Sequence, residues 1–223
     1  MAAALTMVSG VAVAAGVISA GVIAADLVAG RHQKMRIMNA VWPLTALWAG
    51  PLGLGAYFRF GRAPRTHDPP DAGQPPSFVV AVGKATTHCG SGCTLGDLLA
   101  ESFAALAPLT VFGQRLFGSW AYDFVAAYVL GIVFQYFTIK PMSDLSRGQA
   151  LVRAVKADTL SLLAWQTGMY GWMAIARFVI FERDLPKTSP IFWFMMQLGM
   201  LLGFATSYPV NWWLLRRGIK DPM

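Results

Sequence analysis

Charged residues are scarce in this 223-residue chain. Asp, Glu, Lys and Arg together make up 13% of the residues, about half the share found in soluble domains, whereas hydrophobic residues make up 56%. So few charged side chains cannot cover the surface of a water-soluble domain of this size. The composition therefore excludes an ordinary soluble protein and indicates a chain that is surrounded by lipid.

Basic residues are also missing from the start of the chain. No Lys or Arg precedes Arg31, so the first apolar stretch lacks the charged region of a cleaved signal peptide, and it is too long for one. We therefore expect it to be retained as a first transmembrane helix. The net charge of +7 comes from short basic clusters between apolar runs and not from a basic face, which argues against a nucleic-acid partner.

Apolar runs of about twenty residues, the length that crosses the hydrocarbon core as a helix, recur along the chain. We expect an all-α integral membrane protein, in which one domain is a bundle of about six transmembrane helices. The predicted helices lie at about 4–29, 37–58, 94–114, 119–139, 159–181 and 190–215.

Two segments between these helices are too polar to span. Residues 59–77 are rich in proline and are expected to form an extended linker. Residues 140–158 mix apolar and basic side chains and are expected to lie as an amphipathic segment at the membrane interface. Eleven Lys and Arg fall on one side of this arrangement and six on the other, which predicts both termini in the cytoplasm and a location in the inner (plasma) membrane. The early basic cluster at 31–36 opposes that orientation.

The only two cysteines, Cys89 and Cys93, directly follow His88. Two nearby glycines weaken a helix here, so we expect a loop and then a helix capped by Thr94. Two thiolates and an imidazole suit copper or zinc. The spacing resembles copper-binding motifs of membrane-tethered copper-insertion proteins and of the binuclear copper centre of cytochrome oxidase. The alternative interpretation is a pair of small buried residues in a close-packed turn.

Acidic residues at predicted membrane depth are the second candidate feature. Asp97 and Glu101 follow Cys93 at four-residue spacing, and Asp123 lies in the next predicted helix. A charge at mid-bilayer costs about 2.5–3.5 kcal/mol, so these acids should face an ion path or a structural partner such as Arg177. The predicted metal ligands are His88, Cys89 and Cys93, and the predicted ion-path or supporting residues are Asp97, Glu101 and Asp123.

Five runs of sequence resemble an uncharacterised bacterial membrane family, domain of unknown function 4396. They are HCGSGCTLGD at 88–97, LGIVFQYF at 130–137, KADTLS at 156–161, FWFMMQ at 192–197 and TSYPVNWWLLRRGIK at 206–220. The resemblance covers most of the chain. It implies a small multi-pass membrane protein and supplies no activity and no site residues.

The sequence therefore predicts a membrane protein that binds or moves a transition-metal ion, copper or zinc, and it indicates no catalytic residue. A membrane thiol-redox protein using the two cysteines and a structural or accessory subunit without chemistry are the alternatives. The expected partners are the lipid bilayer and the metal ion, together with a second membrane chain if the protein works as a homo-oligomer or in a complex.

Overall fold

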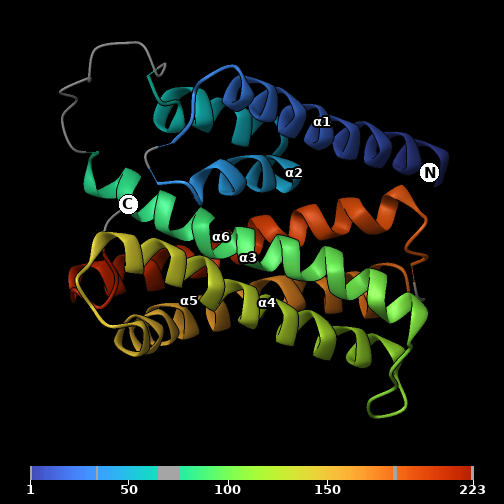
Figure 1. Cartoon of the computed structure of the whole chain (residues 1–223). Helices are drawn as coiled ribbons and strands as arrows, with labels where there is room; N and C mark the ends of the chain where they lie inside the picture. Colours follow the sequence, from blue (N-terminus) through green and yellow to red (C-terminus); the bar gives the residue numbers. More distant parts are fainter. Residues whose placement is uncertain (1, 34, 65–75, 183–184, 222–223) are drawn as a thin grey trace.

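The computed structural model describes residues 2–33, 35–64, 76–182 and 185–221, and these form a bundle of long helices (Figure 1). Its elements are α1 (Ala2–Val28), α2 (Met38–Ala56), the π-helix η1 (Tyr57–Gly61), α3 (Phe78–Leu106), α4 (Arg115–Ile139), the short η2 (Lys140–Met142), α5 (Arg147–Ile175), the π-helix η3 (Ala176–Ile180) and α6 (Pro190–Arg216). The expectation of an all-helical protein holds for the described residues, which contain no strand. The predicted linker at 59–77 begins inside η1, and its residues 65–75 lie outside the described residues.

Three of the helices, α1, α4 and α6, are long and apolar enough to cross a membrane. Helices α3 and α5 have 29 residues each, or about 43 Å at 1.5 Å per residue, which exceeds the hydrocarbon thickness although they carry more polar side chains. Large apolar side chains point outward along several helices, among them Ile18 in α1 and Val129 in α4. An apolar outer surface of this kind matches a lipid environment.

Helix α2 does not cross the bundle, because it reverses direction at Gly50. This glycine has φ 55° and ψ −134°, which are not helical, and Pro51 follows it. The rings of Trp42 and Tyr57 are 5.7 Å apart, whereas a straight helix would separate these residues by about 22 Å. A Cβ on Gly53 would lie 3.1 Å from the Cα of a residue seven positions earlier. Residues 38–49 and 51–61 therefore form a helical hairpin that enters the bundle and returns.

The hairpin corrects one prediction and bears on a second. Residues 37–58 are not a single crossing helix. Gly50 and Pro51 break the apolar stretch that composition alone predicts as one helix. Consequently α1 begins and α6 ends at opposite ends of the bundle, whereas the prediction places both termini on one side of the membrane (Figure 1). Helix α1 is held to the outer arm of the hairpin by Asp26, which accepts hydrogen bonds from Tyr57 at 2.8 Å and from Arg62 at 2.7 and 2.9 Å.

Basic residues concentrate at one end of this arrangement. We call the end where α1 and α6 finish and α3 begins the basic end, and the opposite one the far end. Among the described Lys and Arg residues, twelve lie in elements or connections toward the basic end and three toward the far end. The twelve are Arg31, Arg36, Arg59, Arg62, Lys84, Lys140, Arg147, Arg153, Lys156, Arg216, Arg217 and Lys220, and the three are Arg115, Arg177 and Lys187.

The cysteine segment is helical, contrary to the predicted loop. Residues 78–106 form one helix, and the Thr94 hydroxyl donates to the Gly90 carbonyl at 2.7 Å instead of capping a helix start. The glycines serve close packing: a Cβ on Gly92 would lie 2.9 Å from the Gly131 Cα, and one on Gly96 would lie 2.6 Å from the Ala127 nitrogen. Helices α3 and α4 thus approach backbone to backbone, as small residues allow in membrane bundles.

The segment predicted to lie at the interface, 140–158, is mostly the start of α5. A capping box begins this helix, in which the Ser146 side chain accepts from the Gln149 nitrogen at 3.3 Å and the Gln149 side chain accepts from the Ser146 nitrogen at 3.0 Å. One face of these first turns is buried, including Ala154 and Asp158, while Val152 on another face is exposed. The face that packs on the bundle consists of Ala150, Ala154, Ala157 and Asp158, whereas the larger apolar side chains Leu151 and Val152 point outward.

Candidate functional site

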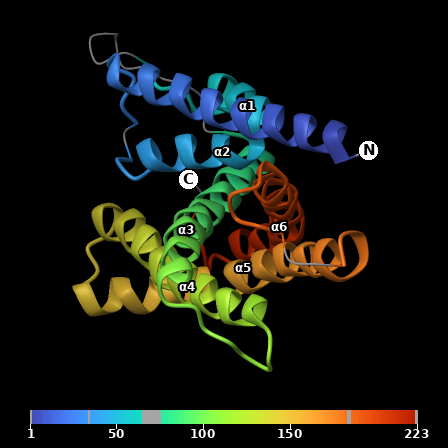
Figure 2. The same cartoon turned by 90° about the vertical axis from the view of Figure 1, so that its right-hand side faces the viewer.

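Helix α3 occupies the centre of the bundle, with α2, α4, α5 and α6 around it (Figure 2). Its residues at four-residue spacing form one buried stripe, because such residues stack on one face of a helix. Along this stripe Cys89, Cys93, Asp97 and Glu101 are exposed by 1%, 0%, 2% and 6%. Side chains from the surrounding helices extend the stripe to both ends of the bundle, and we call the whole set the polar column.

At the basic end the column starts with Lys220, which follows α6 and is fully buried. Its ammonium donates to the Ala85 carbonyl at 3.2 Å and to Asn211 Oδ1 at 2.8 Å. Asn211 in turn donates to the Ser161 hydroxyl at 2.7 Å. Burial lowers the pKa of Lys220, and the nearby Cys89 and Asp158 oppose that shift. The Lys220 side chain is thus enclosed within the bundle and bonded to neutral acceptors.

The middle of the column consists of Asp158 on α5 and the two cysteines. The Asp158 carboxylate interacts electrostatically with the Cys89 thiol, and the Cys89 and Cys93 side chains adjoin each other. Neither Asp158 oxygen has a hydrogen-bond partner of good geometry among the described residues, although both are buried. Gly131 on α4 lies directly against this carboxylate, which leaves no space for a larger residue there.

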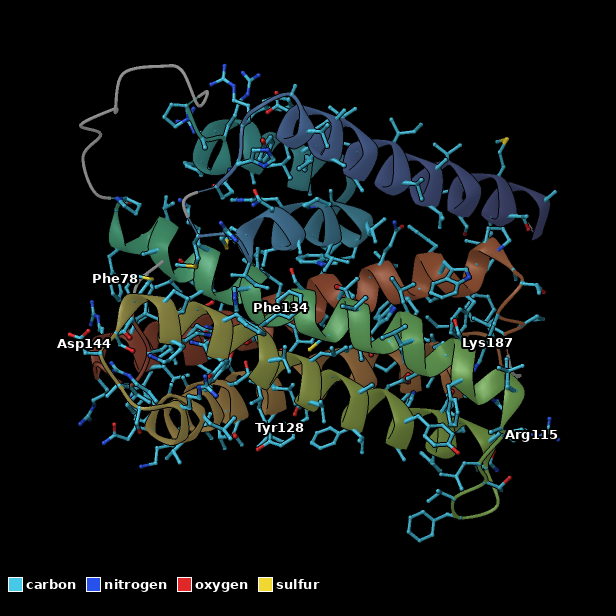
Figure 3. The ribbon with its side chains drawn as sticks, in the orientation of Figure 1. Phe78, Arg115, Tyr128, Phe134, Asp144 and Lys187 are labelled. Atoms are coloured by element: carbon cyan, nitrogen blue, oxygen red, sulfur yellow. The ribbon has the colours of Figure 1, made fainter. Side chains whose placement is uncertain are left out.

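At the far end three acids come together with one lysine. Glu101 forms an ion pair with Lys187 and accepts a hydrogen bond from Ser119 at 3.2 Å, and Lys187 also donates to the Ser119 hydroxyl at 3.2 Å. Asp123 interacts electrostatically with both members of the pair, and Asp97 interacts with Asp123 and Glu101. Figure 3 shows Lys187 at this end, far from Phe78 at the start of α3.

A cavity of about 370 Å³ adjoins the far end of the column. It lies between the end of α3, the start of α4 and the α5–α6 connection, and Glu101, Ser119, Lys187, Arg177 and Arg115 are among its lining residues. The Glu101–Lys187 pair thus separates this cavity from the acids deeper in the bundle.

The structure brings five of the six predicted site residues into the column and leaves out His88. Adjacent residues on a helix point about 100° apart, so His88 faces α4 while Cys89 faces the column. The His88 Nε2 atom is 2.9 Å from the Thr138 hydroxyl, and its ring contacts the edge of Phe134. Nowhere in the described residues do three or more His, Cys, Asp and Glu side chains group as a metal site would require.

Three charged column residues were not among the predicted site residues: Asp158, Lys187 and Lys220. Asp158 was interpreted as an interfacial residue because α5 was predicted to start beside it. The four-residue spacing of Ala150, Ala154 and Asp158 was the available signal, since it continues the apolar face through the acid. No comparable signal marks the two lysines, which reach the column from chain segments outside the helices.

Comparison with known proteins gives one match. Residues 80–220 match the family described as Domain of unknown function (DUF4396). No curated protein and no solved structure matches the chain. The matched region contains the complete polar column, from the beginning of α3 to Lys220.

Proposed function

The chain belongs to this family of unknown function, and from the polar column we propose that it is a transport protein that moves protons across the membrane. The carboxyls of the column would pass the proton from one end of the bundle to the other. The observation that carries the proposal is a set of buried carboxylates at successive heights, some of whose oxygen atoms have no hydrogen bond of good geometry within the described residues. These are both oxygens of Asp97 and Asp158 and one of Asp123.

The energetic cost of these groups supports a functional role. Each charge at mid-bilayer costs about 2.5–3.5 kcal/mol even on the lenient insertion scale, and an unpartnered carboxylate recovers little of that cost. Packing would be served equally well by Leu or Asn at these positions. A carboxyl that takes up and releases a proton is the simplest use of a buried acid without a fixed partner.

The column divides into two halves. Lys220, Asn211, Ser161 and Asp158 form the half at the basic end, and the cluster around Asp97 forms the half at the far end. Between them lies the turn of α3 that carries the two cysteines. We propose that each half opens to one side of the membrane and that the cysteine turn is the barrier between them. The excess of basic residues at the basic end favours that end as the cytoplasmic one.

The proposal is tested with purified protein in liposomes that contain a pH-sensitive dye. A potassium diffusion potential should drive protons inward in wild-type vesicles. Asp158→Asn and Asp123→Asn remove one carboxyl from each half and should each lower the flux at least tenfold. Asp144→Asn, an exposed acid outside the column, is the matched control and should leave the flux unchanged.

Two results would overturn the proposal. One is wild-type flux no greater than that of empty vesicles, and the other is normal flux in both column variants when their thermal unfolding resembles that of the wild-type protein.

A transition-metal cargo is the second candidate, and the adjoining thiols of Cys89 and Cys93 favour it. Thiolates select soft ions such as Cu(I) and also bind zinc, and Asp158 lies beside the first of them. On this hypothesis the metal passes through the cysteine turn, and His88 contributes only if its ring leaves Thr138. Metal analysis of the Cys89→Ser and Cys93→Ser variants tests it: both should lose the copper or zinc that wild type retains after dialysis.

A further inference from the structure

A second cavity, of about 270 Å³, lies beside the polar column at the tip of the α2 hairpin. It lies between α1, the hairpin, α3 and α6. Almost all of its wall is apolar, and the hairpin carries the break at Gly50 just beyond Trp48. The lining residues that matter here are Trp48, Asp97, Trp193, Met196, Gln197 and Met200.

Two lining residues carry polar atoms that have no hydrogen bond within the described part of the chain, the Asp97 carboxylate and the Trp48 indole N–H, and Asp97 is the acid of the pair. It is 2% exposed, and neither of its oxygens has a partner. Gln197 is already engaged, since its amide donates to the Leu47 carbonyl at 2.7 Å, and the Thr94 hydroxyl donates to the Gly90 carbonyl at 2.7 Å. The cavity therefore lies against one unpaired carboxylate, which is buried in its wall, and apart from the Trp48 N–H the wall is otherwise apolar.

Two further features of the wall favour a positive ligand. Trp48 and Trp193 both line it, and the faces of indole rings attract organic cations more strongly than other aromatic rings do. The first arm of the hairpin also ends here, and the C-terminal end of a helix carries partial negative charge from its free carbonyls. Broken helices with such ends at membrane depth are a common way to bind cations in transporters.

We propose that this cavity binds a small apolar ammonium cation, which pairs with Asp97 and packs against Trp48 and Trp193. The cation takes the place of the proton on the Asp97 carboxyl, and that proton passes to the acids at the far end of the column. Charge is balanced, because one cation enters as one proton leaves. The proposal rests on the proposed proton path and names the substrate class that the path would serve. Met196 and Met200 supply adaptable thioether walls that suit apolar groups of differing shape.

Competition between cation and proton makes the binding depend on pH. The titratable groups that face Asp97 are Cys93 and Glu101 on α3, Asp123 on α4 and Tyr170 on α5, and Lys187 lies beyond them as the ion-pair partner of Glu101. Since one proton is displaced for each cation bound, affinity should fall by up to tenfold per pH unit where Asp97 is protonated.

The test measures binding of benzyltrimethylammonium to the purified full-length protein by titration calorimetry. Asp97→Asn keeps the shape of the side chain, removes its charge and should weaken binding at least tenfold. Asp144→Asn is the matched control, because it removes an exposed carboxylate outside the column and away from the cavity, and it should bind within twofold of wild type. Trp48→Leu should weaken binding severalfold, and wild-type affinity should fall as pH is lowered.

Equal binding by wild type and Asp97→Asn would overturn the proposal. The proposal would also be overturned if wild type bound copper or zinc ions but not benzyltrimethylammonium, and if Asp97→Asn abolished the metal binding. The cavity would then be a metal site. Binding needs no transport, so a normal titration with absent proton flux would reject the proton path alone. Normal flux without cation binding would reject the cavity proposal alone.

Discussion

The Glu101–Lys187 pair allows a quantitative test of how the column holds its charges. The side chain of Glu101 is 7% exposed and that of Lys187 is 37% exposed, so the two partners differ in how they can respond when the other is lost. If Glu101 becomes Gln, the ammonium can turn toward water and still donate to Ser119. If Lys187 becomes Met, the Glu101 carboxylate stays buried beside Asp123 and Asp97 and loses its ion-pair partner.

The expected free-energy changes follow from this asymmetry. Removing one partner of a buried pair costs about 3–5 kcal/mol when the remaining charge cannot reach water. Lys187→Met should approach the lower value, about 3 kcal/mol. Glu101→Gln should cost about 1 kcal/mol or less, as for a pair whose remaining partner is solvated. The double variant should be more stable than Lys187→Met alone, because it leaves no uncompensated charge at this site.

The measurement is the unfolding free energy of the detergent-solubilised protein, taken from SDS or thermal titrations of the four forms. Ser119→Ala is a useful control, because it removes the shared hydroxyl and keeps both charges. The reasoning would be refuted if Glu101→Gln were as costly as Lys187→Met. It would also be refuted if the double variant were no more stable than Lys187→Met, since the lysine would then act by packing and not by compensating charge.

Three further predictions follow from the fold. Topology reporters fused before α1 and after α6 should report opposite sides of the membrane, with the C-terminal reporter in the cytoplasm; the same side for both would contradict the hairpin. Gly96→Ala should destabilise the protein by about 1–3 kcal/mol, because its Cβ would lie 2.6 Å from the Ala127 nitrogen, whereas Gly83→Ala on the same helix meets nothing and should stabilise by up to about 1 kcal/mol; unfolding measurements that reverse this order would contradict the packing. Because burial lowers the pKa of Lys220, the unfolded chain binds more protons there than the native one, so stability should rise with pH toward 10.5, the ordinary lysine value. Lys220→Met should lose that rise in pH-dependent unfolding, and an unchanged slope would show that Lys220 is not the group responsible.

The helices that composition predicted well are those with uniform apolar surfaces. The predicted ranges 4–29, 119–139 and 190–215 match α1, α4 and α6 within a few residues, because a long apolar run has only one stable form in lipid. Helix α2 was misjudged for a related reason. Hydropathy averages over a window and does not register that Gly50 and Pro51 permit a reversal in the middle of an apolar run.

The cysteine segment was misjudged because glycine has two roles. In water Gly90, Gly92 and Gly96 would weaken a helix, which led to the predicted loop. In a membrane bundle the same residues let α3 approach its neighbours closely, and every backbone group must be satisfied within the helix. Only the tertiary contacts decide between these roles. The stripe from Cys89 to Glu101 was predictable from spacing. The exclusion of His88 was not, because His88 points away from the stripe only if this segment is helical, and its glycines argued against a helix.

The family match and the cavity beside Asp97 involve partly different segments of the chain. The matched region, residues 80–220, contains every residue of the polar column, whereas the cavity beside Asp97 is completed by α1 and the hairpin, which precede that region. If the column moves protons and the cavity selects the exchanged cation, these tasks are carried by different parts of the chain. Changes at the hairpin tip, such as Trp48→Leu, would then alter which cation binds while leaving proton movement intact. Asp97 belongs to both parts, and it is the residue through which binding of one ion would drive release of the other.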